Sequence, residues 1–185
     1  MRVVSGKFGS RSLKPVPGSK TRPTTDKVKE SLFNMIGPFF NGGLFLDLYA
    51  GSGSVAIEAV SRGFDSAVLV DHQYLAIKTI KENVKMTKEI DAFRIYKMDS
   101  DMALKRFADQ NDKFDYIFLD PPYKDQKMVD QLNIIKEKEL LNDDGIVICE
   151  TDDNVVLKDD VEGYDMVKQK KYGITIISIY KIKRG

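Results

Sequence analysis

The sequence predicts an α/β fold built on a mostly parallel, seven-stranded sheet. Short apolar runs alternate with longer amphipathic segments from Leu44 onward, and this alternation is typical of parallel strands that are joined by helices. Only a short turn at Gly173 separates the last two extended runs, so we expect them to pair as an antiparallel hairpin at one edge of the sheet. The expected strands are 44–49, 67–71, 93–97, 115–119, 145–150, 164–172 and 174–182.

Helices are expected between the parallel strands and also before the first strand. The intervening ones are expected near 54–62, 73–87, 101–110 and 126–138. The preceding helix is expected to start at Thr24, Thr25 or Asp26, whose side chains can accept hydrogen bonds from the first turn. Gly37 and Pro38 are expected to end it. Its apolar positions keep helical spacing and are Val28, Leu32, Met35, Ile36 and Phe39.

The length and composition are those of one globular domain. A chain of 185 residues can bury roughly 70% of its unfolded surface in a single core. We therefore expect one domain over 1–185, with a basic hairpin or arm over 1–24 and the core over 25–185. No apolar run approaches the roughly 18 residues that cross a bilayer, and no signal-peptide pattern follows Met1. A monomeric, cytoplasmic protein without membrane contacts is the expectation.

Cysteine and histidine usage restricts the chemistry. The lone Cys149 lies in an apolar run that begins at Ile146, so a buried structural thiol is expected there rather than a disulfide or a nucleophile. His72 is the single histidine, and no cluster of cysteine and histidine accompanies it. Neither a metal site nor a Ser-His-Asp triad is therefore expected.

Charge is unevenly distributed along the chain although the net charge is only +1. Residues 139–165 contain ten acidic residues against Lys158 alone. We expect a polyanion to be drawn to the amino-terminal side, although a solvated charged hairpin is the alternative. The basic residues in 1–25, where no acidic residue occurs, are Arg2, Lys7, Arg11, Lys14, Lys20 and Arg22.

A glycine turn follows the first expected strand. Gly51 and Gly53 allow the backbone to approach a ligand without a Cβ clash, and the helix that follows offers free N–H groups. Asp71 comes 20 residues after Gly51, at the end of the next strand, where its carboxylate can accept hydrogen bonds from both hydroxyls of a ribose. This combination predicts a nucleoside cofactor, with a tight structural turn as the alternative.

The acidic strand ends favour S-adenosylmethionine over a dinucleotide. Asp47 would repel a pyrophosphate but attract an ammonium group, although it can also cap the adjacent loop. Asp99, at the end of the third strand, can accept from an adenine N6 amine, and a helix N-cap is an equal alternative. The residues expected to bind the cofactor are Asp47, Tyr49, Gly51, Ser52, Gly53, Asp71, Asp99 and Ser100.

The run Asp120-Pro121-Pro122-Tyr123 follows the fourth expected strand. Neither proline can donate to a sheet ladder, so the strand must end there, and the topology rule for open parallel sheets places this loop near the glycine turn. Asp120 and the Pro121 carbonyl can accept hydrogen bonds from an amine on a base. Tyr123 offers a face for stacking, worth roughly 1–3 kcal/mol. These four residues are the predicted catalytic loop for methyl transfer, with a simple turn as the alternative.

These residues together resemble the RsmD-type 16S rRNA (guanine-N2) methyltransferases, which have the Rossmann-like class I S-adenosylmethionine-dependent fold. The resemblance covers nearly the whole chain. It includes "MRVVSGK" at the start with Arg11 and Leu13, "RPTTDKVKESLFN" from Arg22, "DLYAGSGSVAIEAVSRG" from Asp47, and "DPPY". The glycine motif and "DPPY" are shared by many amino-methyltransferases, whereas the segment from Arg22 is much more specific.

The resemblance implies methyl transfer to the N2 amine of one guanine in 16S rRNA, during assembly of the small ribosomal subunit. It implies that Asp71 binds the ribose of the cofactor and Asp99 the adenine, while Asp120 and Tyr123 hold the guanine. In this family the ribose ligand is often Glu, so Asp71 reaches less far. The residues expected to contact RNA are Lys7, Arg11, Lys14, Arg22 and Thr24, with 22–25 at the mouth of the site.

Two other functions fit part of the pattern. A DNA adenine-N6 methyltransferase shares "DPPY" and its mechanism, but 185 residues leave no room for a DNA target-recognition domain. A non-catalytic RNA-binding assembly factor with a vestigial cofactor fold is disfavoured because Asp120 and Tyr123 are present. The "DPPY" loop alone does not distinguish guanine from adenine.

Overall fold

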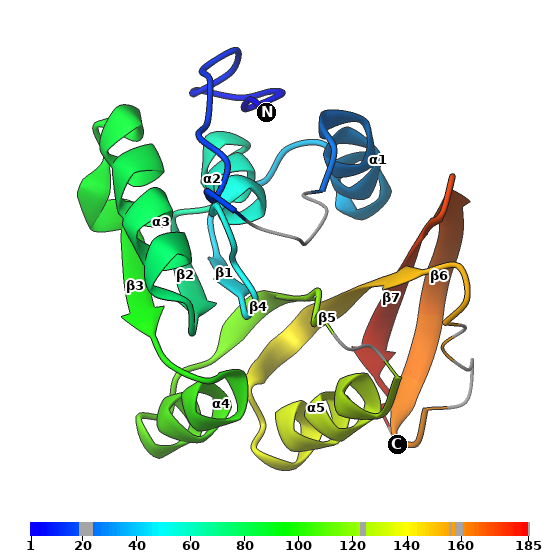
Figure 1. Ribbon diagram of the computed structural model, residues 1–185. Helices are drawn as coiled ribbons and strands as arrows, with labels where there is room; N and C mark the ends of the chain where they lie inside the picture. The colour runs from blue at the N-terminus through cyan, green and yellow to red at the C-terminus, as the bar shows by residue number, and fades with distance from the viewer. Residues whose placement is uncertain (19–23, 123–124, 156, 158–160, 185) are drawn as a thin grey trace. The chain divides into compact units, whose positions relative to one another are not determined.

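A computed structural model describes residues 1–18, 24–122, 125–155, 157 and 161–184 of the chain (Figure 1). The described residues form a seven-stranded sheet with the order β3-β2-β1-β4-β5-β7-β6. The predicted α/β fold with a mostly parallel sheet and an antiparallel C-terminal hairpin is thereby confirmed. The chain divides into two compact units, Met1–Ser100 and Asp101–Gly185. The single domain expected over 1–185 stays a prediction.

The first unit contains the parallel strands β1 (Leu44–Asp47), β2 (Ser66–Asp71) and β3 (Phe93–Lys97). Leu44 pairs with Ser66 and Asp47 with Leu69, so β1 and β2 run in register toward the same edge. The interior residues of β1 and β2 are almost all apolar and buried, as expected for parallel strands that are covered on both faces. β1 ends at Asp47, two residues earlier than expected, because the turn already begins at Leu48.

Three α-helices belong to the first unit: α1 (Asp26–Ile36), α2 (Ser54–Ser61) and α3 (Tyr74–Thr87). A short 3-10 helix (Ile90–Ala92) precedes β3, and α3 lies along β3 (Figure 1). The Thr25 hydroxyl caps α1 by accepting a hydrogen bond from the Val28 N–H at 3.3 Å. Gly37 ends α1 with φ of +126°, which only glycine adopts readily.

The expected apolar face of α1 is wrong at Phe39. Gly37 ends the helix before this residue, and Phe39 is 62% exposed. The helical spacing of apolar residues continues in the sequence beyond the end of α1, so the prediction included Phe39 in the apolar face.

The N-terminal arm, residues 1–18, forms an irregular hairpin with a single antiparallel bridge between Arg2 and Ser12. The Val3 N–H donates to the Arg11 carbonyl at 2.9 Å. Three apolar side chains of the arm are buried, so the arm belongs to the core of the first unit and is not a free appendage. These side chains are Val3, Phe8 and Leu13.

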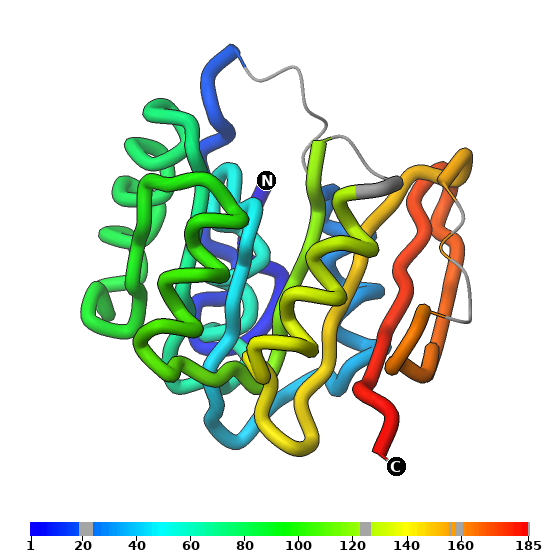
Figure 2. The backbone as a smooth tube through the Cα atoms, turned by 90° about the horizontal axis from the view of Figure 1, so that it is seen from below, coloured from blue at the N-terminus to red at the C-terminus, as the bar shows by residue number. Residues whose placement is uncertain are grey.

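The second unit contains β4 (Phe114–Leu119), β5 (Leu141–Asp152), β6 (Tyr164–Tyr172) and β7 (Thr175–Ile182), with helices α4 (Ser100–Asp109) and α5 (Asp125–Glu137). β4 and β5 are parallel, whereas β7 is antiparallel to both β5 and β6. The tubes of β6 and β7 lie side by side in Figure 2. Gly173, with φ of +62°, makes the tight turn between them, as predicted.

Two expectations are resolved within β5. Cys149 is fully buried, and burial raises the pKa of its thiol, which confirms a structural thiol. The strand begins at Leu141 and not at 145, because Leu141 already pairs with Phe114. The polar run that follows Leu141 resembles a turn in the sequence. Within the described ranges, no helix is both long and apolar enough to cross a membrane.

Candidate active site

The loop between β1 and α2 leaves open space in front of one glycine and packs tightly at the other. Gly51 and Gly53 both have left-handed φ values, +55° and +81°. A Cβ at Gly51 would meet nothing within 4 Å, whereas one at Gly53 would lie 3.0 Å from the Leu69 side chain. Gly53 is therefore required for packing, and Gly51 presents its backbone to whatever the loop binds. Gly53 also caps α2 without a side-chain hydrogen bond, which leaves the first N–H groups of the helix to a ligand.

Asp71, at the end of β2, holds this loop in place. One of its carboxylate oxygens accepts from the Gly51 N–H and the other from the Gln73 N–H, both at 2.9 Å. Its side chain is 13% exposed. Because each carboxylate oxygen has a second lone pair, both can still accept from the hydroxyls of a ribose. The residues present therefore fit a nucleoside cofactor.

Other predicted cofactor residues of the first unit also meet. The Tyr49 hydroxyl donates to Ser100 Oγ at 3.0 Å, which joins the glycine loop to the last residue of the first unit. Asp47 is 1% exposed at the end of β1. Asp99 is exposed and directly precedes α4, so adenine binding and helix capping both remain open for it. The cofactor contacts of these residues stay predictions.

Asn83, a residue that the sequence reasoning missed, fastens the glycine loop from behind. It lies on α3 and is 3% exposed. Its Nδ2 donates to the carbonyls of Ser52 and Lys14 at 2.9 and 3.0 Å, and its Oδ1 accepts from the Lys14 N–H at 2.8 Å. One amide thus joins the loop, α3 and the N-terminal arm. A polar residue on the apolar face of α3 was the signal in the sequence.

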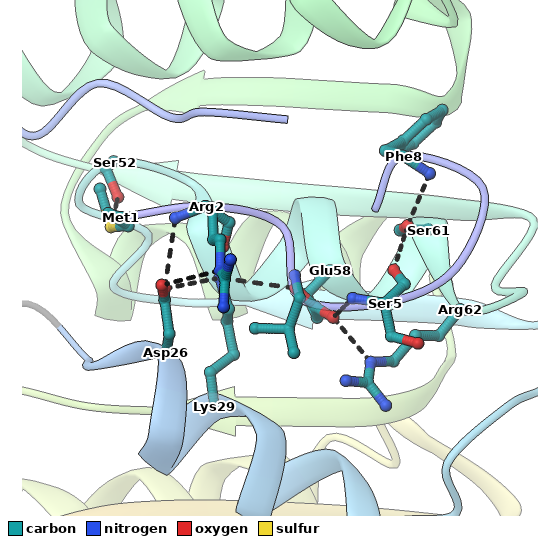
Figure 3. A network of polar contacts seen from close by, with 11 residues as sticks. Met1, Arg2, Ser5, Phe8, Asp26, Lys29, Ser52, Glu58, Ser61 and Arg62 are labelled. Carbon is teal, nitrogen blue, oxygen red and sulfur yellow. Dashed lines mark hydrogen bonds and ion pairs between the residues drawn. The ribbon is translucent and has the colours of Figure 1, made fainter. Parts of the chain in front are cut away.

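A second buried connection is centred on Glu58 of α2 (Figure 3). Its fully buried carboxylate accepts from the N–H groups of Val4 and Ser5 at 2.8 and 2.9 Å. It also forms ion pairs with Lys29 at 3.5 Å and with Arg62 at 2.8 Å. The Lys29 ammonium donates to the Arg2 carbonyl at 2.6 Å, and burial lowers the pKa of Lys29 while Glu58 opposes that shift. α1, α2 and the N-terminal arm are therefore locked together.

The basic residues of the arm, which were expected to contact RNA, are engaged with α3 and the segment after it. Lys7 forms an ion pair with Glu89, and Lys14 forms one with Glu82 at 2.9 Å. Arg11 donates to the carbonyls of Met86 and Thr87, at 3.0 and 3.2 Å, near the end of α3. Thr24 is half-buried, and Arg22 lies outside the described residues. Contact of these five residues with RNA stays a prediction.

The catalytic loop is partly described in the second unit. β4 ends at Leu119, and only Asp120 separates it from the prolines that were expected to end it. Asp120 is half-buried, Pro121 is buried and Pro122 is exposed, whereas Tyr123 lies outside the described residues. The catalytic roles of these residues stay predictions. No cluster of side chains that could hold a metal ion occurs among the residues that the structure describes.

The strand order, the glycine loop after β1 and the acidic end of β2 define a class I S-adenosylmethionine-dependent methyltransferase. The sequence model of the family described as "Conserved hypothetical protein 95" matches residues 1–181. The chain belongs to this family, which contains the RsmD-like methyltransferases. The predicted resemblance and the predicted cofactor class are thereby confirmed.

Curated relatives and solved structures agree with this assignment. "Putative rRNA methyltransferase YlbH" of Bacillus subtilis is 49% identical, and the match covers 100% of both chains. "Ribosomal RNA small subunit methyltransferase D" of Escherichia coli is 29% identical over 82% of this chain and 75% of the relative. The solved structure described as a putative methyltransferase yhhF from Escherichia coli has a TM-score of 0.82 at 25% identity, covering 100% of this chain and 99% of the other.

Proposed function

We propose that this protein transfers a methyl group from S-adenosylmethionine to the exocyclic N2 amine of one guanine in 16S rRNA. The use of S-adenosylmethionine is supported above all by the open glycine loop, in which the Gly51 N–H donates a hydrogen bond to Asp71. The choice of rRNA as substrate rests on the relatives, since one that is 49% identical along its full length has the name "Putative rRNA methyltransferase YlbH". The more distant relative named for the small subunit supports the choice of 16S rRNA.

Five of the eight predicted cofactor residues have a stated role in this proposal. When bound, the cofactor would supply a methyl group on a sulfonium sulfur; transfer would break the S–C bond and leave a thioether, form an N–C bond, and pass the amine proton to water. Asp71 accepts hydrogen bonds from the ribose, and the backbone at Gly51 and Gly53 lies against the methionine portion. Asp47 offers negative charge to the ammonium group, and Asp99 accepts from the adenine amine.

The loop after β4 holds the acceptor amine. Its nitrogen lone pair is delocalised into the guanine ring and is a poor nucleophile. Asp120 and the Pro121 carbonyl accept hydrogen bonds from the amine N–H, which orients the lone pair toward the methyl group. Because proline φ is locked, the direction of this carbonyl is fixed with little loss of entropy. Tyr123 stacks on the extruded base.

Small subunits, rather than free DNA, are the proposed substrate. The protein would act in the cytoplasm, where the subunits assemble, and as a monomer. The test uses labelled cofactor with three acceptors: small subunits from cells that lack this protein, 16S rRNA alone, and double-stranded DNA. We expect label in the rRNA, on guanine N2, and none in DNA. Label in DNA alone would overturn the proposal in favour of an adenine-N6 enzyme, and no label in any acceptor would favour a non-catalytic assembly factor.

A further inference from the structure

One face of α3 presents a stripe of one tyrosine followed by four lysines that the proposed function does not use. Its residues follow steps of four, three, four and three positions, so they lie on one side of the helix. All five are exposed, whereas the opposite face, including Ile77, Ile80 and Val84, is buried. The stripe consists of Tyr74, Lys78, Lys81, Lys85 and the C-cap residue Lys88.

The N-terminal arm neutralises the acidic groups that would otherwise compensate this stripe. Glu82, on the edge of the same face, forms an ion pair with Lys14 at 2.9 Å, and Glu89 pairs with Lys7. The hydrogen bond and the charge of Lys14 lower the pKa of Glu82, and Lys78 and Lys85 lower it further. In the part of the chain that the structure describes, none of the four stripe lysines forms an ion pair.

Helix stability does not account for four lysines in a row. Like charges three or four positions apart destabilise a helix by about 0.2–0.5 kcal/mol per pair; the stripe contains three such lysine pairs, and only two attractive pairs on α3, those of Glu82 with Lys78 and Lys85, oppose them. The Arg11 guanidinium adds a further positive group near the end of the helix, where it binds the carbonyls of Met86 and Thr87. Such a concentration of charge fits a polyanion as its partner.

The position of the stripe relates it to the cofactor loop within the same unit. α3 begins three residues after Asp71, which fastens that loop. Tyr74, the first residue of α3, is 66% exposed, and the Lys97 ammonium lies 5.7 Å from the centre of its ring. From Lys78 to Lys88 the stripe extends about 15 Å along the helix axis, which is enough to meet several consecutive phosphates.

We propose that the exposed face of α3 binds the phosphate backbone of the RNA substrate outside the target nucleotide, with Tyr74 stacking on a base. This inference rests on the proposed function, because it assumes an RNA substrate. The lysines contribute affinity and orientation without reading sequence, since phosphate contacts carry no base information. The arm acts on this surface by pairing Lys14 and Lys7 with the carboxylates of Glu82 and Glu89.

The test compares two triple variants that remove the same charge. K78Q/K81Q/K85Q alters the stripe, and K168Q/K170Q/K181Q alters exposed lysines of the β6–β7 hairpin; each removes three positive charges from a net of +1. Binding to small subunits from cells that lack this protein is measured at several salt concentrations. Each lost phosphate contact reduces the slope of log K against log salt by about 0.7. We expect the stripe variant to lose about two units of slope and at least tenfold in affinity at low salt, and the hairpin variant to lose neither.

Equal salt slopes for the two triple variants would overturn the inference. Affinity for S-adenosylmethionine should be unchanged in both, which shows that the first unit is folded. If the triple variant does not fold, each single Lys→Gln variant is measured instead, and no change of slope in any of them overturns the inference. Tyr74→Leu should weaken binding without altering the slope. Failure of the proposed function can be distinguished from failure of this inference, because the unaltered protein would then leave rRNA unmethylated.

Discussion

The glycine loop after β1 and the proline loop after β4 both follow a parallel strand, but different forces fix their conformations. Side chains from other elements hold the glycine loop: Asp71 at the end of β2 and Asn83 on α3. Two consecutive prolines restrict the other loop through their own rings. Substitutions far away in the sequence should therefore affect the glycine loop, whereas the proline loop should be sensitive only to substitutions within it.

The largest expected effect is on transfer, from a change in the proline loop. Asp120→Ala removes an acceptor for the amine N–H, and we expect the methyl-transfer rate at saturating cofactor to fall about 10²–10⁴-fold. Affinity for the cofactor, measured by calorimetry, should change less than twofold. Asp130→Ala, at an exposed position on α5, is the matched control and should retain full activity. Retained activity in Asp120→Ala would remove this residue from its role.

The buried ion pairs of Glu58 should make a large contribution to the free energy of unfolding. Lys29→Met leaves the Glu58 carboxylate buried with one cation fewer, and removal of one partner of a buried ion pair costs about 3–5 kcal/mol. We expect a loss of that size in the free energy of unfolding, measured with urea. Lys27→Met on the exposed side of the same helix should change it by less than about 0.5 kcal/mol. Equal losses for the two variants would show that the Glu58 network is not needed.

Asp71→Ala should lower the cofactor affinity more than the transfer rate, which is the reverse of the effect expected for Asp120→Ala. It removes the acceptor for the Gly51 and Gln73 N–H groups and the proposed ribose ligand. Hydrogen bonds to a charged group contribute about 1.5–3 kcal/mol, so cofactor affinity should fall roughly 10- to 100-fold. The transfer rate at saturating cofactor should fall far less than in Asp120→Ala. Asp91→Ala, exposed in the 3-10 helix, is the control; unaltered affinity in Asp71→Ala would contradict the assigned role.

The smallest of these effects is expected at Asn83. Asn83→Ala removes the hydrogen-bond partner of the Ser52 carbonyl and of the main-chain N–H and carbonyl of Lys14. We expect unfolding to become easier by about 1–3 kcal/mol, with a smaller loss of cofactor affinity. Lys14→Gln keeps the main-chain bonds and should leave both quantities nearly unchanged. Equal losses of stability and of cofactor affinity in Lys14→Gln and Asn83→Ala would contradict this. They would show that the side chain of Lys14, and not the amide of Asn83, holds the loop.

The local pattern of apolar and polar residues was sufficient to predict the fold and most of the helices and strands. β3 is 93–97 in both prediction and structure. β5 began earlier than expected since Leu141 gains a partner strand, which no local pattern reveals. Apart from the pair of Glu58 with Arg62, which are four positions apart, the Glu58 network, the Asn83 bridge and the pairing of the arm with α3 and Glu89 join residues that are 27 to 82 positions apart. Such contacts depend on the tertiary fold, so residue types alone did not predict them.

The most direct test of the account is a map of N2-methylguanine in 16S rRNA. The map is made from cells that contain this protein, from cells that lack it, and from cells that carry only the Asp120→Ala variant. The account predicts that one guanine loses its N2-methyl group without the protein, regains it with the unaltered chain, and does not regain it with Asp120→Ala. An identical methylation map in all three would contradict it.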